Sequence, residues 1–229
     1  MALYALGDLH LSLGTDKPMD VFGGAWVGYL DKLRTGLQVL TEDDTLVITG
    51  DISWSMNLRD AVPDFRYINA IPGRKLLVKG NHDYWWSTAA KFQKFCEVQG
   101  FTNMELLHNN CRFYGDTALC GTRGWFYEED QKGTQDEKTF RRELHRLETS
   151  LAAAGTHEKY CFLHYPPIYR GYRCQEILDL LAAYEVRRCY YGHLHSQSQR
   201  LAIQGLVDGV EYYMVSADAV NFTPQLVLP

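Results

Sequence analysis

Short apolar runs alternate with amphipathic segments along the first hundred positions of the chain. The runs predict buried strands over residues 3–6, 45–49 and 75–79. Apolar positions at helical spacing predict helices over residues 26–40, 58–71 and 87–99. The second of these helices tolerates Pro63 only in its first turn. Strands and helices in alternation indicate right-handed crossovers and a parallel sheet.

The second half of the chain carries shorter strand-like runs. Three of them are expected to start a second sheet: residues 105–108, 112–114 and 118–121. Further strands are predicted over 160–163 and 188–191, and helices over 137–153 and 176–184. Residues 124–136 are acidic and loop-like, and Asp208-Gly209 signals a hairpin turn. Because no internal repeat or low-complexity linker interrupts the chain, residues 1–229 are predicted to form one domain.

Polar side chains suited to metal binding follow the predicted strands at the points where the strands end. They lie in the segments GDLH, GD, GNHD and GHLH and at a lone histidine. The residues are Asp8, His10, Asp51, Asn81, His82, Asp83, His164, His193 and His195. Open α/β sheets place their sites at the carboxyl ends of the strands. We therefore expect these side chains to converge, although they are scattered through the sequence.

The chemistry of these residues fits two metal ions. On an extended strand end, Asp8 and His10 would point to the same side, because successive side chains alternate. Asp51 could give one lone pair to each of two ions, and Asn81 offers a neutral oxygen that limits the negative charge. Oxygen and imidazole ligands without a thiolate favour Mn, Fe, Zn or Co. Two ions roughly 3.5–4 Å apart would clamp a phosphate and lower the pKa of a bridging water, which supplies the nucleophile.

His82 is predicted to be a catalytic group and not a ligand. It lies between Asn81 and Asp83, where it cannot easily share the direction of Asn81. A protonated imidazole could donate to the leaving oxygen of a substrate. Asp83 is expected to orient this imidazole and to raise its pKa.

Composition and charge narrow the classes of function. Of the 229 residues, 46% are hydrophobic and 22% are charged, which is typical of a globular protein. The formal net charge of -5 argues against sequence-blind nucleic-acid binding, which needs a basic surface. This net charge does not exclude a local basic patch on the surface.

Targeting signals and cysteine usage predict a cytoplasmic protein without a membrane partner. No apolar run approaches the length needed to span a bilayer. The first ten residues lack a charged signal segment with a cleavage site. The six cysteines form no C-x-x-C pair and are expected to be buried free thiols.

The motifs D-x-H, GD, GNHD, a lone histidine and GHxH, in this order, resemble those of the calcineurin-like metallophosphoesterase superfamily. The resemblance spans Asp8 to His195. It implies an α/β fold: a β-sandwich of two mixed sheets flanked by helices on both faces (α/β/β/α), in a single domain. It also implies two divalent metal ions, with Mn, Fe or Zn expected. The phrases KPMD, GDISW, CGTRGW and LHYPP are similar to a bacterial subgroup of predicted phosphohydrolases and identify no substrate.

The resemblance also implies which residues hold the metals. The first ion is expected on the residues Asp8, His10, Asp51 and His195. The second ion is expected on the residues Asp51, Asn81, His164 and His193. His82 matches the catalytic acid of the family.

Three residues near the motifs are candidates for substrate binding: Tyr84, Arg123 and Arg170. Tyr84, Trp85 and Trp86 could stack on a base or sugar, but aromatic residues at a strand-to-helix turn belong more often to the core. Arg123 in GTRGW or Arg170 after HYPP could grip a phosphate in bidentate fashion, and a solvated charge run explains them equally well. The histidines outside the motifs are expected on the surface or in the core; they are His108, His145 and His157.

Three functions are compatible with this sequence. The first is a phosphoesterase that hydrolyses phosphomonoesters or phosphodiesters of a small molecule by attack of a metal-bridging hydroxide. The second is a nuclease of the same superfamily, which the net charge disfavours. The third is a non-catalytic metal-binding scaffold that keeps the fold for protein binding. The complete ligand set favours the phosphoesterase, and the sequence predicts no oligomeric state.

Overall fold

Apolar side chains on both faces of the central strands decide how the layers stack. In β2 (Thr45–Ile48), Val47 packs between the two sheets, whereas Leu46 and Ile48 pack against helices. The same alternation recurs in β7 (Glu158–Leu163) of the other sheet. A strand with two apolar faces must be covered on both, so a second sheet lies on one side and helices lie on the other.

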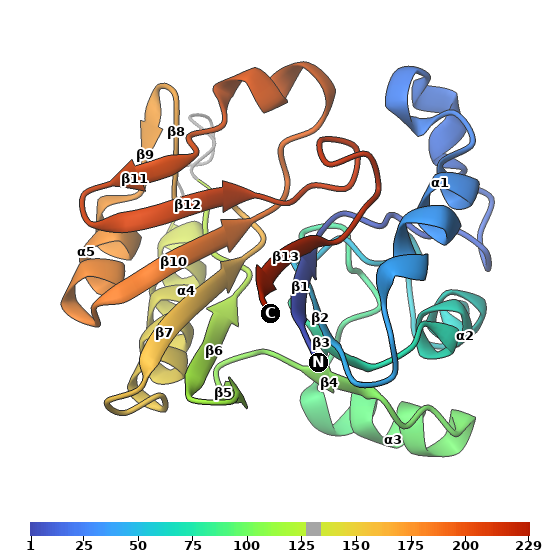
Figure 1. Cartoon of the computed structure of the whole chain (residues 1–229), viewed down its shortest axis with the longest axis horizontal. Helices are drawn as coiled ribbons and strands as arrows, with labels where there is room; N and C mark the ends of the chain where they lie inside the picture. Colours follow the sequence, from blue (N-terminus) through green and yellow to red (C-terminus); the bar gives the residue numbers. More distant parts are fainter. Residues whose placement is uncertain (127–133) are drawn as a thin grey trace.

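The computed structural model describes residues 1–126 and 134–229, without the side chains of residues 134–136. Two sheets face each other across an apolar core, and helices cover the outer face of each sheet (Figure 1). This α/β/β/α arrangement of two mixed sheets is the fold class predicted from the sequence. The two ends of the chain lie close together, and Tyr114 Oη contacts the backbone oxygens of both Met1 and Pro229.

The first sheet has the strand order β13-β1-β2-β3-β4. In that order the strands are Gln225–Leu228, Leu3–Leu6, Thr45–Ile48, Arg74–Leu77 and Met104–Leu106. β1 to β4 run parallel, as predicted for the first three, and β13 pairs with β1 in the antiparallel direction. The prediction that residues 105–108 start a second sheet is wrong, because Lys75 pairs with Met104 and places β4 beside β3.

The second sheet has the strand order β11-β12-β10-β7-β6-β5. In that order the strands are Gly205–Val207, Val210–Met214, Val186–Tyr191, Glu158–Leu163, Thr117–Thr122 and Cys111–Tyr114. The four inner strands run parallel, and the two edge strands are antiparallel to their neighbours. The hairpin turn predicted at Asp208-Gly209 is confirmed, since φ is 51° and 84° at these two residues, which join β11 to β12.

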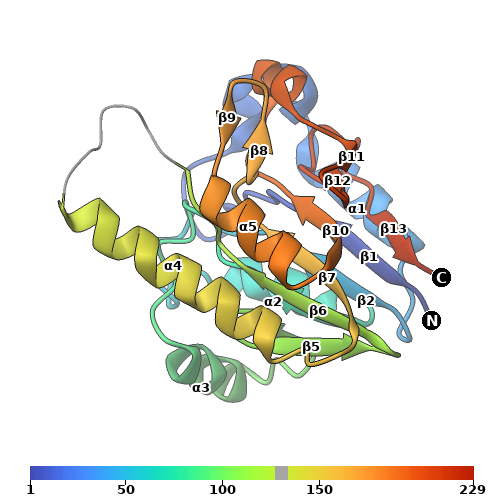
Figure 2. The ribbon, with the colours of Figure 1, turned by 90° about the vertical axis from the view of Figure 1, so that its left-hand side faces the viewer.

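Helices form the two outer layers (Figures 1 and 2). The helices on the first sheet are α1 (Tyr29–Gly36), α2 (Val62–Ala70) and α3 (Ala89–Gln99). The helices on the second sheet are α4 (Thr134–Ala152) and α5 (Gln175–Ala183). α2 has its proline in the first turn, as predicted.

Two predicted segments differ from the observed ones in extent. The helix expected over residues 26–40 is shorter, because Gly28 adopts a left-handed φ of 65° before α1 and 3-10 turns flank the helix. α4 begins at Thr134, inside the predicted acidic loop 124–136; residues 127–133 of that loop lie outside the described residues. No helix in the described part of the chain is long and apolar enough to cross a membrane.

Three strands were not predicted from the sequence: β13 and the antiparallel pair β8 (Ile168–Tyr169) and β9 (Tyr172–Arg173). The two strands of the pair have two residues each and are too short to show the apolar run that marks a buried strand. The prediction of buried free thiols holds for every cysteine except Cys111, which is free but only partly buried.

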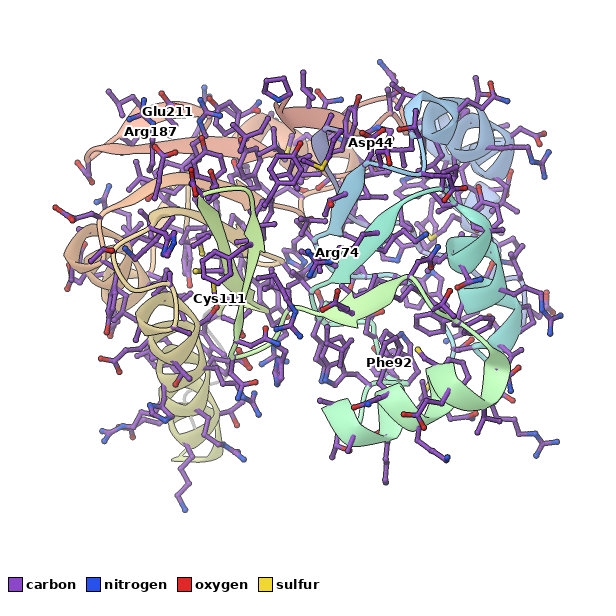
Figure 3. The ribbon with its side chains drawn as sticks, turned by 60° about the horizontal axis from the view of Figure 1, so that its bottom comes forward. Asp44, Arg74, Phe92, Cys111, Arg187 and Glu211 are labelled. Atoms are coloured by element: carbon purple, nitrogen blue, oxygen red, sulfur yellow. The ribbon has the colours of Figure 1, made fainter. Side chains whose placement is uncertain are left out.

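Glu105 joins the two sheets at the edge formed by β4 and β5. Its carboxylate accepts hydrogen bonds from Arg74 Nε and Arg112 Nε, each at 2.7 Å. Figure 3 views this edge, with Arg74 on the first sheet and Cys111, the neighbour of Arg112, on the second. Because these side chains are partly exposed, we expect the two ion pairs of Glu105 to align the edges of the two sheets more than to stabilise the fold.

Phe162 tests the core between the sheets. It is fully buried, and its ring stacks on Tyr190 with centroids 5.1 Å apart. We expect Phe162→Ala to lower the free energy of unfolding by about 3–5 kcal/mol, because it removes apolar contacts and leaves a cavity. Phe22, which is 66% exposed, provides the control: Phe22→Ala should change the same quantity by less than about 0.5 kcal/mol. Urea denaturation measures both, and equal losses would contradict this description of the core.

Candidate metal centre

Four of the predicted site residues have left-handed backbone conformations just after their strands. The φ angles are 60° at Asp8, 46° at His10, 48° at Asp51 and 72° at His193. The prediction that Asp8 and His10 lie on an extended strand end is therefore wrong. Such conformations cost roughly 1–3 kcal/mol each and need support from their surroundings. Here Asp8 N donates to Gly50 O and His10 N donates to Asp51 O, each at 2.9 Å.

Asp8, His10 and His195 form one group of potential metal ligands. One ligand atom from each residue lies within 4.8 Å of the other two. His195 Nε2 is 3.4 Å from His10 Nε2 and 3.3 Å from Asp8 Oδ1. Because β1 and β10 belong to different sheets, the group lies where the carboxyl ends of both sheets meet.

Asp51, His164 and His193 form a second group within the same 4.8 Å limit. His164 Nε2 lies 3.5 Å from Asp51 Oδ2 and 2.6 Å from Asn81 Oδ1, so Asn81 joins this group. The second group gathers residues that follow β2, β3, β7 and β10. The structure thus brings together every residue that the sequence analysis nominated as a ligand.

A single carboxylate oxygen faces both groups. Asp51 Oδ2 is 3.7 Å from His10 Nε2 and 3.5 Å from His164 Nε2. The other oxygen, Oδ1, accepts a hydrogen bond from the backbone N of His82 at 2.8 Å, which fixes the carboxylate. This is the placement that a ligand shared by two cations needs.

Two of the imidazoles have Nδ1 engaged elsewhere, which leaves Nε2 to face the centre. His164 Nδ1 donates to Thr49 O at 3.0 Å, and His195 Nδ1 pairs with Asp218 Oδ1 at 2.8 Å. Metal-binding histidines commonly have such a partner, which sets the tautomer and the ring orientation. Since His164 donates through Nδ1, its Nε2 presents a lone pair to Asn81 Oδ1 at 2.6 Å. Both atoms, His164 Nε2 and Asn81 Oδ1, are then acceptors. Two acceptors at so short a distance fit a site in which both bind the same cation.

Asp218 is a site residue that the sequence analysis missed. Its carboxylate is buried, and its Oδ2 also accepts a hydrogen bond from Ser196 N at 3.0 Å. It follows β12 in the segment VSAD, where an apolar run ends in a carboxylate. An apolar run that ends in a polar residue also identified the other strand ends. Near β12, however, the hairpin turn at Asp208-Gly209 is the stronger sequence pattern.

Buried charge dominates the electrostatics of the site. Burial raises the pKa of Asp51 to about 8, and the neighbouring charge of Asp8 adds to the effect. Burial lowers the pKa of His193 to about 3 and holds the pKa of His10 well below its usual value, so both imidazoles are neutral and offer lone pairs. Burial opposes the charged form of His195, but neighbouring carboxylates raise its pKa to about 10. The neutral imidazoles of His10 and His193, beside crowded carboxylates, are donors that fit divalent cations.

Asp83 forms no hydrogen bond or ion pair with the side chain of His82. Instead it is buried and accepts hydrogen bonds from Ile52 N at 2.8 Å and from Gly80 N at 2.7 Å. The prediction that Asp83 orients His82 and raises its pKa is therefore wrong. Burial, followed by the charge of His164, lowers the pKa of His82 to about 4.

Aromatic side chains surround His82 in place of Asp83. Tyr84 Oη lies 3.2 Å from His82 Nδ1, and the Trp54 ring lies 4.4 Å from the imidazole. Trp54 also stacks on His10 at 5.1 Å, although the sequence analysis did not nominate it. Tyr84 is 48% exposed and borders the site, whereas Trp85 is buried in the core.

The two arginines nominated for substrate binding differ in their placement. Arg123 follows β6, and its backbone O accepts hydrogen bonds from His164 N and Tyr165 N. The Tyr165 ring lies 4.6 Å from that of His193, so the Arg123 loop adjoins the centre. Arg170 is exposed in the β8–β9 turn, and its side chain forms no hydrogen bond or ion pair within residues 1–126 and 134–229.

Comparison of the chain with models of known protein families gives a match. A family model described as calcineurin-like phosphoesterase matches residues 1–197, a range that contains every nominated ligand, and the resemblance stated from the motifs is confirmed. A search of curated proteins gives no match.

Solved structures with the same fold cover almost the whole chain at low identity. Phosphopantetheinyl hydrolase (PptH) from Mycobacterium tuberculosis aligns with a TM-score of 0.63 and 13% identity, over 100% of this chain and 96% of that one. A protein of unknown function, AQ665 from Aquifex aeolicus, gives 0.51 and 17%, over 98% and 95%. TT1561 of Thermus thermophilus gives 0.53 and 13%, over 99% and 97%. At these identities the likeness concerns the fold alone.

Asp218→Ala tests whether the Asp218 carboxylate positions His195. We expect the affinity for Mn²⁺ to fall roughly 10–100-fold, because the imidazole loses the partner that fixes its tautomer and orientation. Isothermal titration calorimetry with Mn²⁺ measures the change. Asp31→Ala is the control, since Asp31 lies on α1 with 81% of its side chain exposed. An unchanged affinity in Asp218→Ala would show that His195 needs no such partner.

Proposed function

The chain belongs to the calcineurin-like phosphoesterase family, and from this premise we propose that it hydrolyses phosphomonoesters or phosphodiesters of a small molecule at a dinuclear metal centre. Membership implies metal-dependent phosphoester hydrolysis. The observation that carries the dinuclear proposal is Asp51 Oδ2, which faces one group of potential ligands at 3.7 Å and the other at 3.5 Å. A site for one cation would need only one of these groups.

The ligands are assigned as two sets that share one carboxylate. One cation would be held by Asp8, His10, Asp51 and His195. The other would be held by Asp51, Asn81, His164 and His193. Their oxygen and imidazole donors favour Mn, Fe or Zn. When bound, such a pair stabilises the charge of the phosphoryl group and supplies a water of lowered pKa.

His82 is assigned the role of general acid. Its pKa of about 4 in the free protein means that the negative charge of a bound phosphoryl group must raise this pKa before the imidazole can donate a proton. Its Nδ1 lies against Tyr84 Oη, so Nε2 is the atom that remains for the leaving-group oxygen of a substrate. The Trp54 ring, 4.4 Å away, holds the imidazole at the border of the site. A positioned acid of this kind contributes typically about 10²–10⁴-fold to the rate.

Asp83 is assigned a positioning role. It accepts hydrogen bonds from Gly80 N at 2.7 Å and Ile52 N at 2.8 Å. One buried carboxylate therefore joins the loop that carries Asn81 to the loop that carries Asp51. The relative position of these two ligands depends on that link.

A small-molecule substrate fits the surroundings of the site better than a polyanion. The net charge of -5 disfavours a nucleic-acid backbone. The aromatic rings of Trp54 and Tyr165 lie beside the ligands His10 and His164, and Tyr84 lies beside His82. The name of the Mycobacterium tuberculosis neighbour, phosphopantetheinyl hydrolase, describes hydrolysis of a phosphopantetheinyl group. We extend to this chain only the reaction class, because the two share 13% identity.

Metal content and activity should change together. Protein loaded with Mn²⁺ should hydrolyse p-nitrophenyl phosphate or bis-p-nitrophenyl phosphate, and removal of the metal with EDTA should abolish turnover until Mn²⁺ is restored. Asp51→Asn should weaken both sites, because both cations would share this carboxylate, and elemental analysis should show the loss. Asp31→Asn, on an exposed position of α1, is the matched control. Full metal loading without hydrolysis of any phosphoester would contradict the proposal.

His82→Ala should separate the acid from the ligands. We expect both metals to remain and kcat for phenyl phosphate to fall roughly 10²–10⁴-fold. The loss should be smaller for p-nitrophenyl phosphate, because its leaving group needs little protonation. His145→Ala changes an exposed histidine of α4 and should behave like the wild type. If His82→Ala instead loses metal, then His82 is a ligand and the assignment as acid is wrong.

A further inference from the structure

Cysteines occupy directly paired positions on four adjacent strands of the second sheet. Cys111 of β5 pairs with Cys120 of β6, Cys120 pairs with Cys161 of β7, and Cys161 pairs with Cys189 of β10. Three of them belong to the core cluster beneath α4 and α5, and Cys111 packs against that cluster, so all four lie on one face of the sheet (Figure 2). A single buried thiol packs as a small apolar group. A row of four brings thiols next to one another, which apolar packing does not require.

Access to solvent decreases along this cysteine row. Cys111 lies on the edge strand β5 and is only partly buried, as its position in Figure 3 shows. Cys120, Cys161 and Cys189 are fully buried. An oxidant in solution therefore reaches the row through Cys111.

A hydroxyl group of α4 fixes β5 and β6 relative to each other at the first pair of the row. Ser150 Oγ accepts a hydrogen bond from Gly121 N at 2.9 Å and donates one to Asn110 O. Gly121 follows Cys120, and Asn110 precedes Cys111. Paired residues of antiparallel strands have Cα atoms about 4.5–5.5 Å apart. This range lies within the roughly 4.4–6.8 Å that a disulfide spans, so the backbone is already placed for a disulfide between Cys111 and Cys120.

The two thiols of this pair differ in acidity. A hydrogen bond with the Cys120 thiol lowers the pKa of Cys111, and the charge of Arg112 adds to this effect, whereas burial opposes it. The same hydrogen bond, together with burial, raises the pKa of Cys120. Because the thiolate is the reactive form, Cys111 is the better nucleophile of the two.

We propose that Cys111 and Cys120 are a modification site, at which they form a reversible disulfide by exchange with a low-molecular-weight disulfide such as oxidised glutathione. The inference concerns the edge of the second sheet and does not rest on the proposed function. Disulfides that form in a reducing compartment are usually transient, and this pair fits that class because one of its thiols is accessible.

The exchange takes two steps. In the first, the Cys111 thiolate forms a bond with one sulfur of oxidised glutathione, the disulfide of glutathione breaks, and one glutathione leaves with the proton that Cys111 lost. In the second, the sulfur of Cys120 attacks Cys111 Sγ and releases the other glutathione, which takes up the proton of Cys120. The two protein thiols thus lose two electrons and two protons, and oxidised glutathione gains them.

The first step also prepares the second. Hydrogen bonding to Cys111 is the main cause that raises the pKa of Cys120, and the charge of Cys111 contributes as well. Both effects end when Cys111 Sγ is bound to glutathione. Cys120 then loses its proton more easily and attacks the sulfur beside it.

The other two thiols of the row form a second pair that is closed to solvent. A hydrogen bond with Cys189, together with burial, raises the pKa of Cys161 well above its usual value. Neither thiol of this pair is exposed. We therefore expect Cys161 and Cys189 to stay reduced while Cys111 and Cys120 are oxidised.

Peptide mapping of the folded wild type tests the proposal directly. The protein is incubated with oxidised glutathione, its remaining thiols are blocked with N-ethylmaleimide, and the digest is analysed by mass spectrometry. The disulfide should join Cys111 to Cys120, and dithiothreitol should restore both thiols. No disulfide, a disulfide between any other two cysteines, or glutathione that stays attached to Cys111 would each overturn the proposal.

Thiol reactivity gives an independent measurement on the reduced protein. Iodoacetamide should alkylate Cys111 at least about tenfold faster than Cys120, because access and thiolate fraction both favour Cys111. Equal rates would contradict the assignment of Cys111 as the attacking thiol.

Variants separate the two steps of the exchange. Cys120→Ser should stop at the mixed disulfide between Cys111 and glutathione, because no second thiol remains beside it. Cys111→Ser should stay unmodified, since the rest of the row is buried. Cys96→Ser removes a buried thiol of α3 outside the row and should form the disulfide as the wild type does. A disulfide at Cys120 in Cys111→Ser would overturn the proposal, and the mapping of the wild type decides it even if a variant does not fold.

Unfolding shows whether the native register selects the pair. In concentrated urea the strands no longer hold the thiols in a row, so oxidised glutathione should produce several disulfide pairings and mixed disulfides. The folded protein should give the Cys111–Cys120 disulfide alone. The same mixture of products under both conditions would mean that the fold does not direct the reaction, and the proposal would fail.

Discussion

Two carboxylates, Asp8 and Asp51, are buried in one place, and the rest of the site follows from this constraint. Burial raises the pKa of Asp51 to about 8; it acts in the same direction on Asp8, but neighbouring imidazoles, His195 foremost, hold the pKa of Asp8 below its usual range. Backbone groups add support, since His193 N donates to Asp8 Oδ2 at 3.0 Å and His82 N donates to Asp51 Oδ1 at 2.8 Å. Divalent cations would remove the remaining repulsion, so metal binding and local stability are coupled.

The glycines that precede the site residues follow from the same crowding. A Cβ at Gly80 would meet the backbone N and the carboxylate of Asp51, and a Cβ at Gly192 would meet the carboxylate of Asp8. The first contact joins neighbouring strand ends of one sheet and the second joins strand ends of different sheets, and both are possible only where no side chain intervenes. Gly192 of the pair GH is thus a condition for bringing the two sheets to one point. Gly80 of the pair GN lets the loops after β2 and β3 approach each other, and the Asp83 carboxylate joins these two loops.

The sequence predicts what depends on local pattern and misses what depends on distant neighbours. Apolar runs that end in a polar residue identify the strand ends, and the ligands nominated from them converge. Asp218 carries the same signal, but its role appears only when folding places it 2.8 Å from His195 Nδ1. Asp83 is adjacent to His82 in sequence, yet the turn directs its carboxylate to Ile52 and Gly80.

The position of β13 has a consequence for the time course of folding. β1 lies between β2 and β13, and Leu3 pairs with Leu228 near the other end of the chain. Contacts between residues so far apart in sequence close a long loop, which is entropically costly and slow. During synthesis, β1 emerges from the ribosome early but gains its second neighbour only after β13 has followed. Until then one edge of β1 is open to pairing with other chains, so a nascent protein of this architecture is most exposed to aggregation at the strand that leads into Asp8.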